Sequence, residues 1–261
     1  MPLEVKDLSV FLASGEVVTE HISFQIEKGK MLSIVGSSGA GKTTIINLLT
    51  RFYDIDSGSI TIDGQDVTKL PEHKRAAFLG RVFQDPMMGT APTMQIEENL
   101  ALAARRGQPR GLKWGITALE RADYRELLKT LDLGLEDRLT AKVGLLSGGQ
   151  RQALTLLMAS LKQPKLLLLD EHTAALDPKT ADKVLALSDQ IVQENNLTTL
   201  MITHNMKDAI AHGNRLIMMD AGRVVVDISG EDKKKLTVPD LLALFSRASG
   251  SDEANDKMLL S

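Results

Sequence analysis

One stretch constrains this chain more than any other: a glycine-rich loop at residues 36–44. Residues 30–35 before it form a short apolar run, which predicts a buried strand, and residues 43–49 have the apolar spacing of a starting helix. The loop fits the pattern G-x-x-x-x-G-K-[ST], which binds phosphate when it joins a strand to a helix. Its members are Gly36, Ser37, Ser38, Gly39, Ala40, Gly41, Lys42, Thr43 and Thr44.

The chemistry of the loop follows from its residue types. Glycines let successive backbone N–H groups turn toward an anion, and the following helix adds the positive end of its dipole. Lys42 can reach the β- and γ-phosphates of a nucleotide, and the Thr43 hydroxyl can ligate Mg²⁺ between them. The alternative is a glycine-rich turn that binds nothing, and the flanking strand and helix disfavour it. The sequence therefore predicts a site for a nucleoside triphosphate with Mg²⁺.

Composition limits the class of protein. The 261 residues suit one large domain or two small ones, and 43% are hydrophobic, enough for a sizeable core. A net charge of −3 argues against a binder of polyanions, so we expect no nucleic-acid partner. The lack of cysteine excludes disulfides and Cys-based metal sites. The N-terminus lacks a signal-peptide pattern and no apolar stretch reaches the roughly 20 residues that span a bilayer, so we expect a chain that is soluble by itself.

The remaining pattern predicts the alternating strands and helices of an α/β fold. Residues 3–28 read as strands, residues 95–162 are mostly helical, and the polar, acidic stretch 249–261 predicts a disordered tail. Apolar runs without alternation predict strands buried on both faces at 165–171 and 198–203. Further strands are expected at 57–64, 79–84, 215–220 and 223–227, and further helices at 71–78, 153–161, 177–194, 206–212 and 238–245.

Two carboxylates, Asp170 and Glu171, end the run of leucines at 166–169. Downstream of a phosphate loop, the first can hold Mg²⁺ and the second can take a proton from an attacking water. The alternative is that both residues merely end a strand. Together with the loop, the pair predicts a nucleotide hydrolase.

With these motifs in place, the chain resembles the ATP-binding cassette (ABC) ATPases, the motor subunits of ABC transporters, over residues 3 to about 230. Residues 36–43 match the Walker A loop, and residues 166–171 match Walker B with the catalytic glutamate. The family signature L-S-G-G-Q is matched residue for residue at 146–150. The other matching positions are Gln84 in the Q-loop, Asp177 in the D-loop, His204 as the switch histidine, and Phe11 where the family places an aromatic that stacks on adenine.

The resemblance implies an ABC-type P-loop NTPase fold with a mixed β-sheet core, an N-terminal antiparallel β subdomain and an inserted α-helical subdomain. It implies one ATPase domain at 1–248, with the helical subdomain at about 88–162 and the tail at 249–261 outside it. Catalysis would fall to Glu171, His204, Lys42 and Gln84. Mg²⁺ would be held by Thr43, Gln84 and Asp170. ATP would contact Phe11, residues 36–44, Ser147, Gly148, Gly149, Gln150 and Asp177.

The resemblance also implies partners. Two chains, either two copies or this chain with a related ABC ATPase, would dimerise head to tail, so that the signature of each closes over ATP held by the other. Permease subunits on separate chains would span the membrane, a solute-binding protein would deliver the solute, and this chain would lie on the cytoplasmic face of the bacterial inner membrane. A separate ATPase chain favours import by family habit, and residues 81–90 and 170–178 resemble a narrower bacterial group with some links to aromatic amino-acid uptake.

A soluble ABC ATPase outside transport, such as a cofactor-assembly ATPase, is the alternative function. DNA-maintenance members carry a long coiled coil or zinc modules between the loop and the signature. The interval from Thr43 to Ser147 is too short for the coiled coil, and the lack of cysteine disfavours the zinc modules. Translation-type members carry two cassettes, whereas this chain has one.

Some residues keep two interpretations. Phe11 either stacks on a base or packs in the core, and the methionines 87, 88 and 94 either line a groove for a partner helix or belong to the core. The cations within 105–113 face solvent, with lipid headgroups as the alternative, and residues 233–235 are expected to form a solvated turn beside a helix. His172 stands where many family members have Pro or Ala, and no function is assigned to it.

Overall fold

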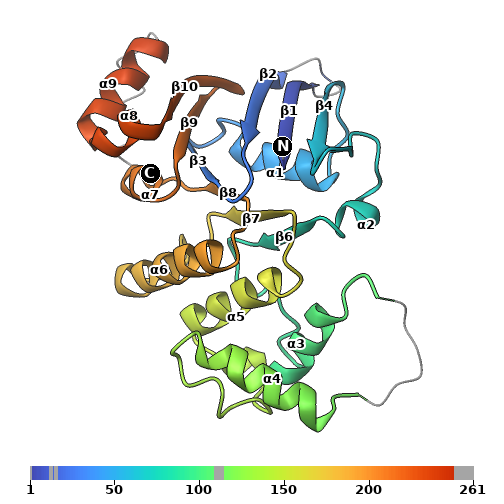
Figure 1. Ribbon diagram of the computed structural model, residues 1–261. Coiled ribbons are helices and arrows are strands. Elements are labelled where there is room, and N and C mark those ends of the chain that lie inside the picture. Colours follow the sequence, from blue (N-terminus) through green and yellow to red (C-terminus); the bar gives the residue numbers. More distant parts are fainter. Residues whose placement is uncertain (1, 12–13, 15–16, 109–114, 250–261) are drawn as a thin grey trace. The chain divides into compact units, whose positions relative to one another are not determined.

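The computed structural model of the chain describes residues 2–11, 14, 17–108 and 115–249. These residues form two compact units (Figure 1). The first unit comprises residues 1–79, 165–171 and 196–261, and the second comprises residues 80–164 and 172–195. The tail predicted at 249–261, except for Ser249, and the end of the predicted basic loop lie outside the described residues.

The first unit begins with an antiparallel sheet, as the sequence predicts. Its four strands lie in the order β2-β1-β4-β5, and every neighbouring pair is antiparallel. Alternate residues point inward, so that Leu3, Val5 and Ile60 are buried while their neighbours are more exposed. The strands are β1 (Leu3–Phe11), β2 (Val17–Ile26), β4 (Ser57–Ile62) and β5 (Gln65–Asp66).

The second sheet contains the strand that leads into the phosphate loop. Five neighbouring strands of this six-stranded sheet lie in the order β10-β9-β3-β8-β7, and the sixth, β6 (Leu79–Val82), carries the chain into the second unit. β3 is parallel to β8 and β9, β7 is parallel to β8, and β10 is antiparallel to β9, so the sheet is mixed as predicted. These strands are β3 (Met31–Gly36), β7 (Leu166–Asp170), β8 (Thr199–Ile202), β9 (Arg215–Asp220) and β10 (Arg223–Ser229).

Alternating residues of the mixed sheet fill two separate cores. On β3, Leu32 and Ile34 join the core that contains the apolar side of α1, whereas Val35 joins the core formed with α7 and α9. Because successive side chains of a strand point to opposite faces, a strand covered on both faces is buried along its whole length, and the one hydroxyl on β3, that of Ser33, donates to the carbonyl oxygen of His212. The helices of this unit are α1 (Lys42–Thr50), α2 (Glu72–Arg75), α7 (Met206–Ala211), α8 (Gly230–Lys235) and α9 (Val238–Ser249).

The second unit is mainly helical. α5 begins five residues earlier than the predicted start at 153, because Ser147 caps it and the two glycines of the signature form its first turn. α2 of the first unit is shorter than predicted and ends at Arg75 rather than near 78. The helices of the second unit are α3 (Ile96–Ala104), α4 (Ala118–Lys129), the 3₁₀ turn Val143–Leu145, α5 (Gly148–Ser160) and α6 (Pro178–Glu194).

Candidate functional site

The glycine loop connects β3 to α1 as its pattern predicts. β3 ends at Gly36 and α1 begins at Lys42, with Gly41 as the N-cap in the left-handed region (φ 95°). Gly41 has no side chain to cap the helix, so the first N–H groups of α1 are available to an anion. A Cβ on Gly36 would lie 2.4 Å from the carbonyl oxygen of Met219, so only glycine fits between β3 and β9. The backbone therefore has the form that phosphate binding requires.

Lys42 is buried beneath its own loop. Its Nζ donates hydrogen bonds to the carbonyl oxygens of Gly36 (2.8 Å) and Ser37 (3.0 Å). Burial lowers the pKa of the Lys42 ammonium, and the nearby carboxylate of Glu171 opposes that shift. The ammonium is thus held by dipoles of the loop that surrounds the predicted phosphate site.

The end of β9 braces the loop, which the sequence did not predict. The Ser37 hydroxyl donates to a carboxylate oxygen of Asp220 at 3.3 Å, and the backbone N–H of Gly222 donates to the carbonyl oxygen of Ala40 at 3.2 Å. Asp220 lies far along the chain from the loop, and only the parallel pairing of β3 with β9 brings it close. No local sequence signal identifies such a partner.

The first predicted carboxylate, Asp170, ends β7 and the second, Glu171, follows it, at the same edge of the sheet as the loop. β3, β8 and β7 are parallel neighbours, so their carboxyl ends meet there. Asp170 is 7% exposed, and Glu171 follows it with a positive φ of 44° while its N–H donates to the carbonyl oxygen of Ile202. His204 follows β8 at the same edge.

Glu171 lies between two basic side chains. One carboxylate oxygen is 3.9 Å from the Nζ of Lys42, and the other is 3.5 Å from the Nδ1 of His204. The structure therefore brings together three of the four predicted catalytic residues. A carboxylate held beside the lysine of a phosphate loop is placed where it can accept a proton from water near a bound phosphate.

The donors at this edge fit magnesium. Within the described ranges, no group of three His, Cys, Asp or Glu side chains could hold a metal by itself. Mg²⁺ in nucleotide sites usually takes one or two protein oxygens together with phosphate oxygens and water. The hydroxyl of Thr43 and the carboxylate of Asp170 are hard oxygen donors of that kind.

The remaining motifs belong to the second unit. Gln84 is exposed and follows β6. The Ser147 hydroxyl accepts from the backbone N–H of Gln150, and the Gln150 side chain accepts from the N–H of Ser147, which closes a capping box. A Cβ on Gly149 would lie 2.2 Å from Thr180 on α6, so glycine lets α5 and α6 pack closely. Contacts of these residues with ATP and Mg²⁺ stay predictions. The same holds for ATP contact by Asp177, which caps α6.

Phe11 ends β1 with 43% of its surface exposed, so its alternative role in the core is wrong. Its N–H donates to Asp56, which holds the strand end while the ring stays accessible. Met87 and Met88 are likewise exposed, at 40% and 68%, whereas Met94 is half-buried. Base stacking by Phe11 therefore remains a prediction that its exposure permits.

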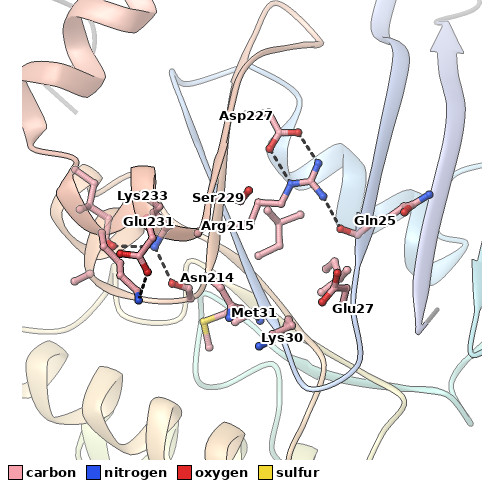
Figure 2. Close-up of a pocket in the computed structure, with 17 residues that line it drawn as sticks. Gln25, Glu27, Lys30, Met31, Asn214, Arg215, Asp227, Ser229, Glu231 and Lys233 are labelled. Atoms are coloured by element: carbon pink, nitrogen blue, oxygen red, sulfur yellow. Dashed lines mark hydrogen bonds and ion pairs between the residues drawn. The ribbon is translucent and has the colours of Figure 1, made fainter.

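The expectation of a solvated turn at 233–235 is wrong for Lys233. This lysine lies on α8 and is only 2% exposed. Its Nζ donates to the carbonyl oxygens of Ile210, His212 and Gly213, and so neutralises the C-terminal end of α7. Lys233 lines a groove of about 1110 Å³. Figure 2 shows Lys233 at one side of this groove, where Arg215 is paired with Asp227.

The fold and the loop, with the carboxylates at its edge, define a P-loop ATPase. A family model described as ABC transporter matches residues 19–174, and the chain belongs to this family, which confirms the resemblance. The chain is an ATP-hydrolysing cassette, the ATP-binding subunit of an ABC transporter.

Two relatives among those found are informative. A tyrosine transport ATP-binding protein from Clostridioides difficile is 46% identical over 250 residues, covering 94% of this chain and 99% of that protein. The methionine import ATP-binding protein MetN from Rhizobium etli is 39% identical over 210 residues, covering 79% of this chain but 55% of MetN.

Solved structures agree on the fold. A dimeric ATP-binding cassette, MJ0796, bound to ADP and Pi, has a TM-score of 0.73 at 27% identity and covers 87% of this chain and 98% of its own. The cbiO1 protein of Clostridium perfringens shares the fold, with a TM-score of 0.77 at 22% identity over 94% of both chains. Of the helices that the structure describes, none has the length and apolar character needed to cross a membrane.

Proposed function

We propose that this chain powers amino-acid import by hydrolysing Mg·ATP with Glu171 as the general base. The observation that carries the proposal is the position of the Glu171 carboxylate, 3.9 Å from Lys42 Nζ and 3.5 Å from His204 Nδ1. Similarity to the tyrosine transport ATP-binding protein and to the methionine import protein MetN supports import of an amino acid over a soluble role in cofactor assembly.

In the proposed reaction, Lys42 and the N-terminus of α1 hold the phosphates of ATP. Glu171 accepts a proton from a water whose oxygen attacks the γ-phosphorus, and the bond from that phosphorus to the bridging oxygen of ADP breaks. His204 holds the carboxylate from its other side. When bound, Mg²⁺ would neutralise phosphate charge, with Thr43, Asp170 and Gln84 as its protein partners.

The proposed partners follow from the same chemistry. Ser147, Gly148 and Gly149 open α5, so they form a second helix N-terminus that suits an anion. We infer that this signature closes over ATP held by a second copy or a related ABC ATPase, as in a head-to-tail dimer. Permease chains and a solute-binding protein would complete an importer, and this subunit would lie on the cytoplasmic face of the bacterial inner membrane. The subunit itself would be one ATPase domain at 1–248, with a helical subdomain at about 88–162.

Substitution of Glu171 by Gln tests the base. Gln keeps the size of the side chain but cannot accept the proton, so ATP should bind while hydrolysis stops and ATP-bound dimers accumulate. Light scattering with and without ATP would measure the dimer. The matched control is Glu126→Gln, because Glu126 is an exposed glutamate paired with Lys129 on α4.

Two outcomes separate the parts of the proposal. Wild-type hydrolysis by Glu171→Gln would refute the assigned base. If that variant stays monomeric in saturating ATP, the isolated subunit does not form the closed dimer. Ser147→Arg in the same background should abolish any dimer. Uptake of labelled tyrosine and methionine by cells with and without Glu171→Gln would test import.

A further inference from the structure

His172, the residue after Glu171, is buried and is not explained by the reaction. It is only 2% exposed, although histidine is often found partly exposed. Its Nε2 lies 2.9 Å from the hydroxyl oxygen of Ser188, which is on α6. The imidazole therefore ties the start of the turn after β7 to the helix that follows this turn.

The protons of this contact can be assigned. The Ser188 hydroxyl lies 2.8 Å from the carbonyl oxygen of Val184, one turn earlier in α6, and a carbonyl can only accept. The single hydroxyl proton is therefore donated to Val184, and the Ser188 oxygen accepts from Nε2–H of His172. His172 acts here as a buried donor, and its partner is fixed in turn by the helix backbone.

The residue before His172 has a backbone conformation that needs support. Glu171 has φ 44°, in the left-handed region that non-glycine residues seldom adopt. On its N-terminal side, its own N–H is bound to the carbonyl oxygen of Ile202. On its C-terminal side, the next residue along the chain is His172, whose side chain is bound to Ser188. Two contacts thus flank the strained backbone, one made by the N–H of Glu171 itself and one made by the side chain of the next residue.

We propose that His172 is a positioning residue, which through Ser188 holds the backbone of Glu171 so that its carboxylate stays where it receives the proton. This inference rests on the proposed role of Glu171 as the base. A carboxylate displaced by about 1 Å can lose about a hundredfold in rate, so a hydrogen bond that makes no contact with the substrate can control catalysis.

A matched pair of substitutions tests the donor. His172→Leu fills a similar volume without a donor, and His172→Gln can place an amide N–H near the position of Nε2. We expect His172→Leu to lower kcat about ten- to a hundredfold with the KM for ATP changed less than about twofold, since only the proton transfer is affected. His172→Gln should recover most of the lost kcat.

Ser188→Ala approaches the same bond from the other side and removes a single oxygen atom, so it keeps the test open if His172→Leu does not fold. Ser188→Ala should lower kcat to a similar extent. The double variant His172→Leu/Ser188→Ala should have no lower kcat than either single variant, because both changes break the same hydrogen bond. The control is Ser160→Ala, another buried serine bonded within its own helix, which should keep wild-type kcat.

Wild-type kcat in both His172→Leu and Ser188→Ala would overturn the inference, as would a loss in His172→Gln equal to that in His172→Leu. Glu171→Gln belongs in the same assay. If it abolishes hydrolysis while the His172 and Ser188 variants are fully active, only the inference about His172 fails. If it hydrolyses ATP normally, the proposed base fails first.

Discussion

Arg75 offers a stability test of the helix behind the phosphate loop. The sequence places it in a short charged helix, where a cation is usually solvated, yet its side chain is fully buried. Burial lowers the pKa of the guanidinium to about 10, so it stays charged at neutral pH. The guanidinium donates to four carbonyl oxygens, those of Leu48, Leu49, Thr68 and Leu70.

Arg75→Met keeps the aliphatic stem and removes the donors. The carbonyl oxygens of Leu48 and Thr68 keep a donor in Arg51, through its backbone N–H (3.2 Å) and its Nη1 (2.6 Å) respectively. The other two carbonyls lose the donor that Arg75 supplies, at about 1–3 kcal/mol for each buried group, or roughly 2–6 kcal/mol together. Because the buried charge also disappears, we expect a net loss of about 2–4 kcal/mol in the free energy of unfolding.

Urea denaturation followed by far-ultraviolet circular dichroism measures this loss. The matched control is Arg51→Met, because the ion pair of Arg51 with Asp54 lies at the surface and the Thr68 carbonyl, to which Arg51 also donates, keeps Arg75 as a donor. Such a pair contributes about 0–1 kcal/mol, so the control should lose much less stability. The reasoning is refuted if Arg75→Met unfolds at the wild-type urea concentration, or if the two variants lose the same free energy.

Three further predictions concern the site and the second unit. Lys42→Ala should lose hydrolysis and weaken ATP binding more than about tenfold, because the phosphates lose a charged donor; normal turnover in an ATPase assay would contradict the phosphate-loop assignment. Phe11→Ala should weaken ATP binding by about 1–3 kcal/mol in calorimetry if the ring stacks on the base, whereas Phe52→Ala, at another exposed ring, should not. Hydrogen bonds from the Thr117 backbone N–H and from Arg105 lower the pKa of the Glu120 carboxyl from 4.5 to about 2. Because the pKa of Glu120 is lower in the folded state, the stabilisation by its carboxylate is present above pH 4.5 and is lost as the pH falls to about 2. The stability advantage of wild type over Glu120→Gln in urea denaturation should therefore shrink in that window, and an advantage independent of pH would contradict this.

Local signals in the sequence determine much of the site. The glycine loop, the cap at Ser147 and the Asp177-Pro178 start of α6 depend on neighbours within a few residues, so the sequence alone locates them. Asp170 and Glu171 are placed at a strand end by the same means, because an apolar run that stops at two charges has few other interpretations.

Tertiary structure decided the residues whose partners are distant in sequence. Asp220 braces the phosphate loop only because β9 pairs with β3, and Lys233 is buried only because α8 lies against the end of α7. Arg75 and His172 are buried for the same kind of reason, since each donates to a helix elsewhere in its unit. Charge and polarity make all four look like surface residues in the sequence. Burial of such groups depends on whether the fold brings carbonyls or hydroxyls to meet them, and that is a property of packing rather than of local pattern.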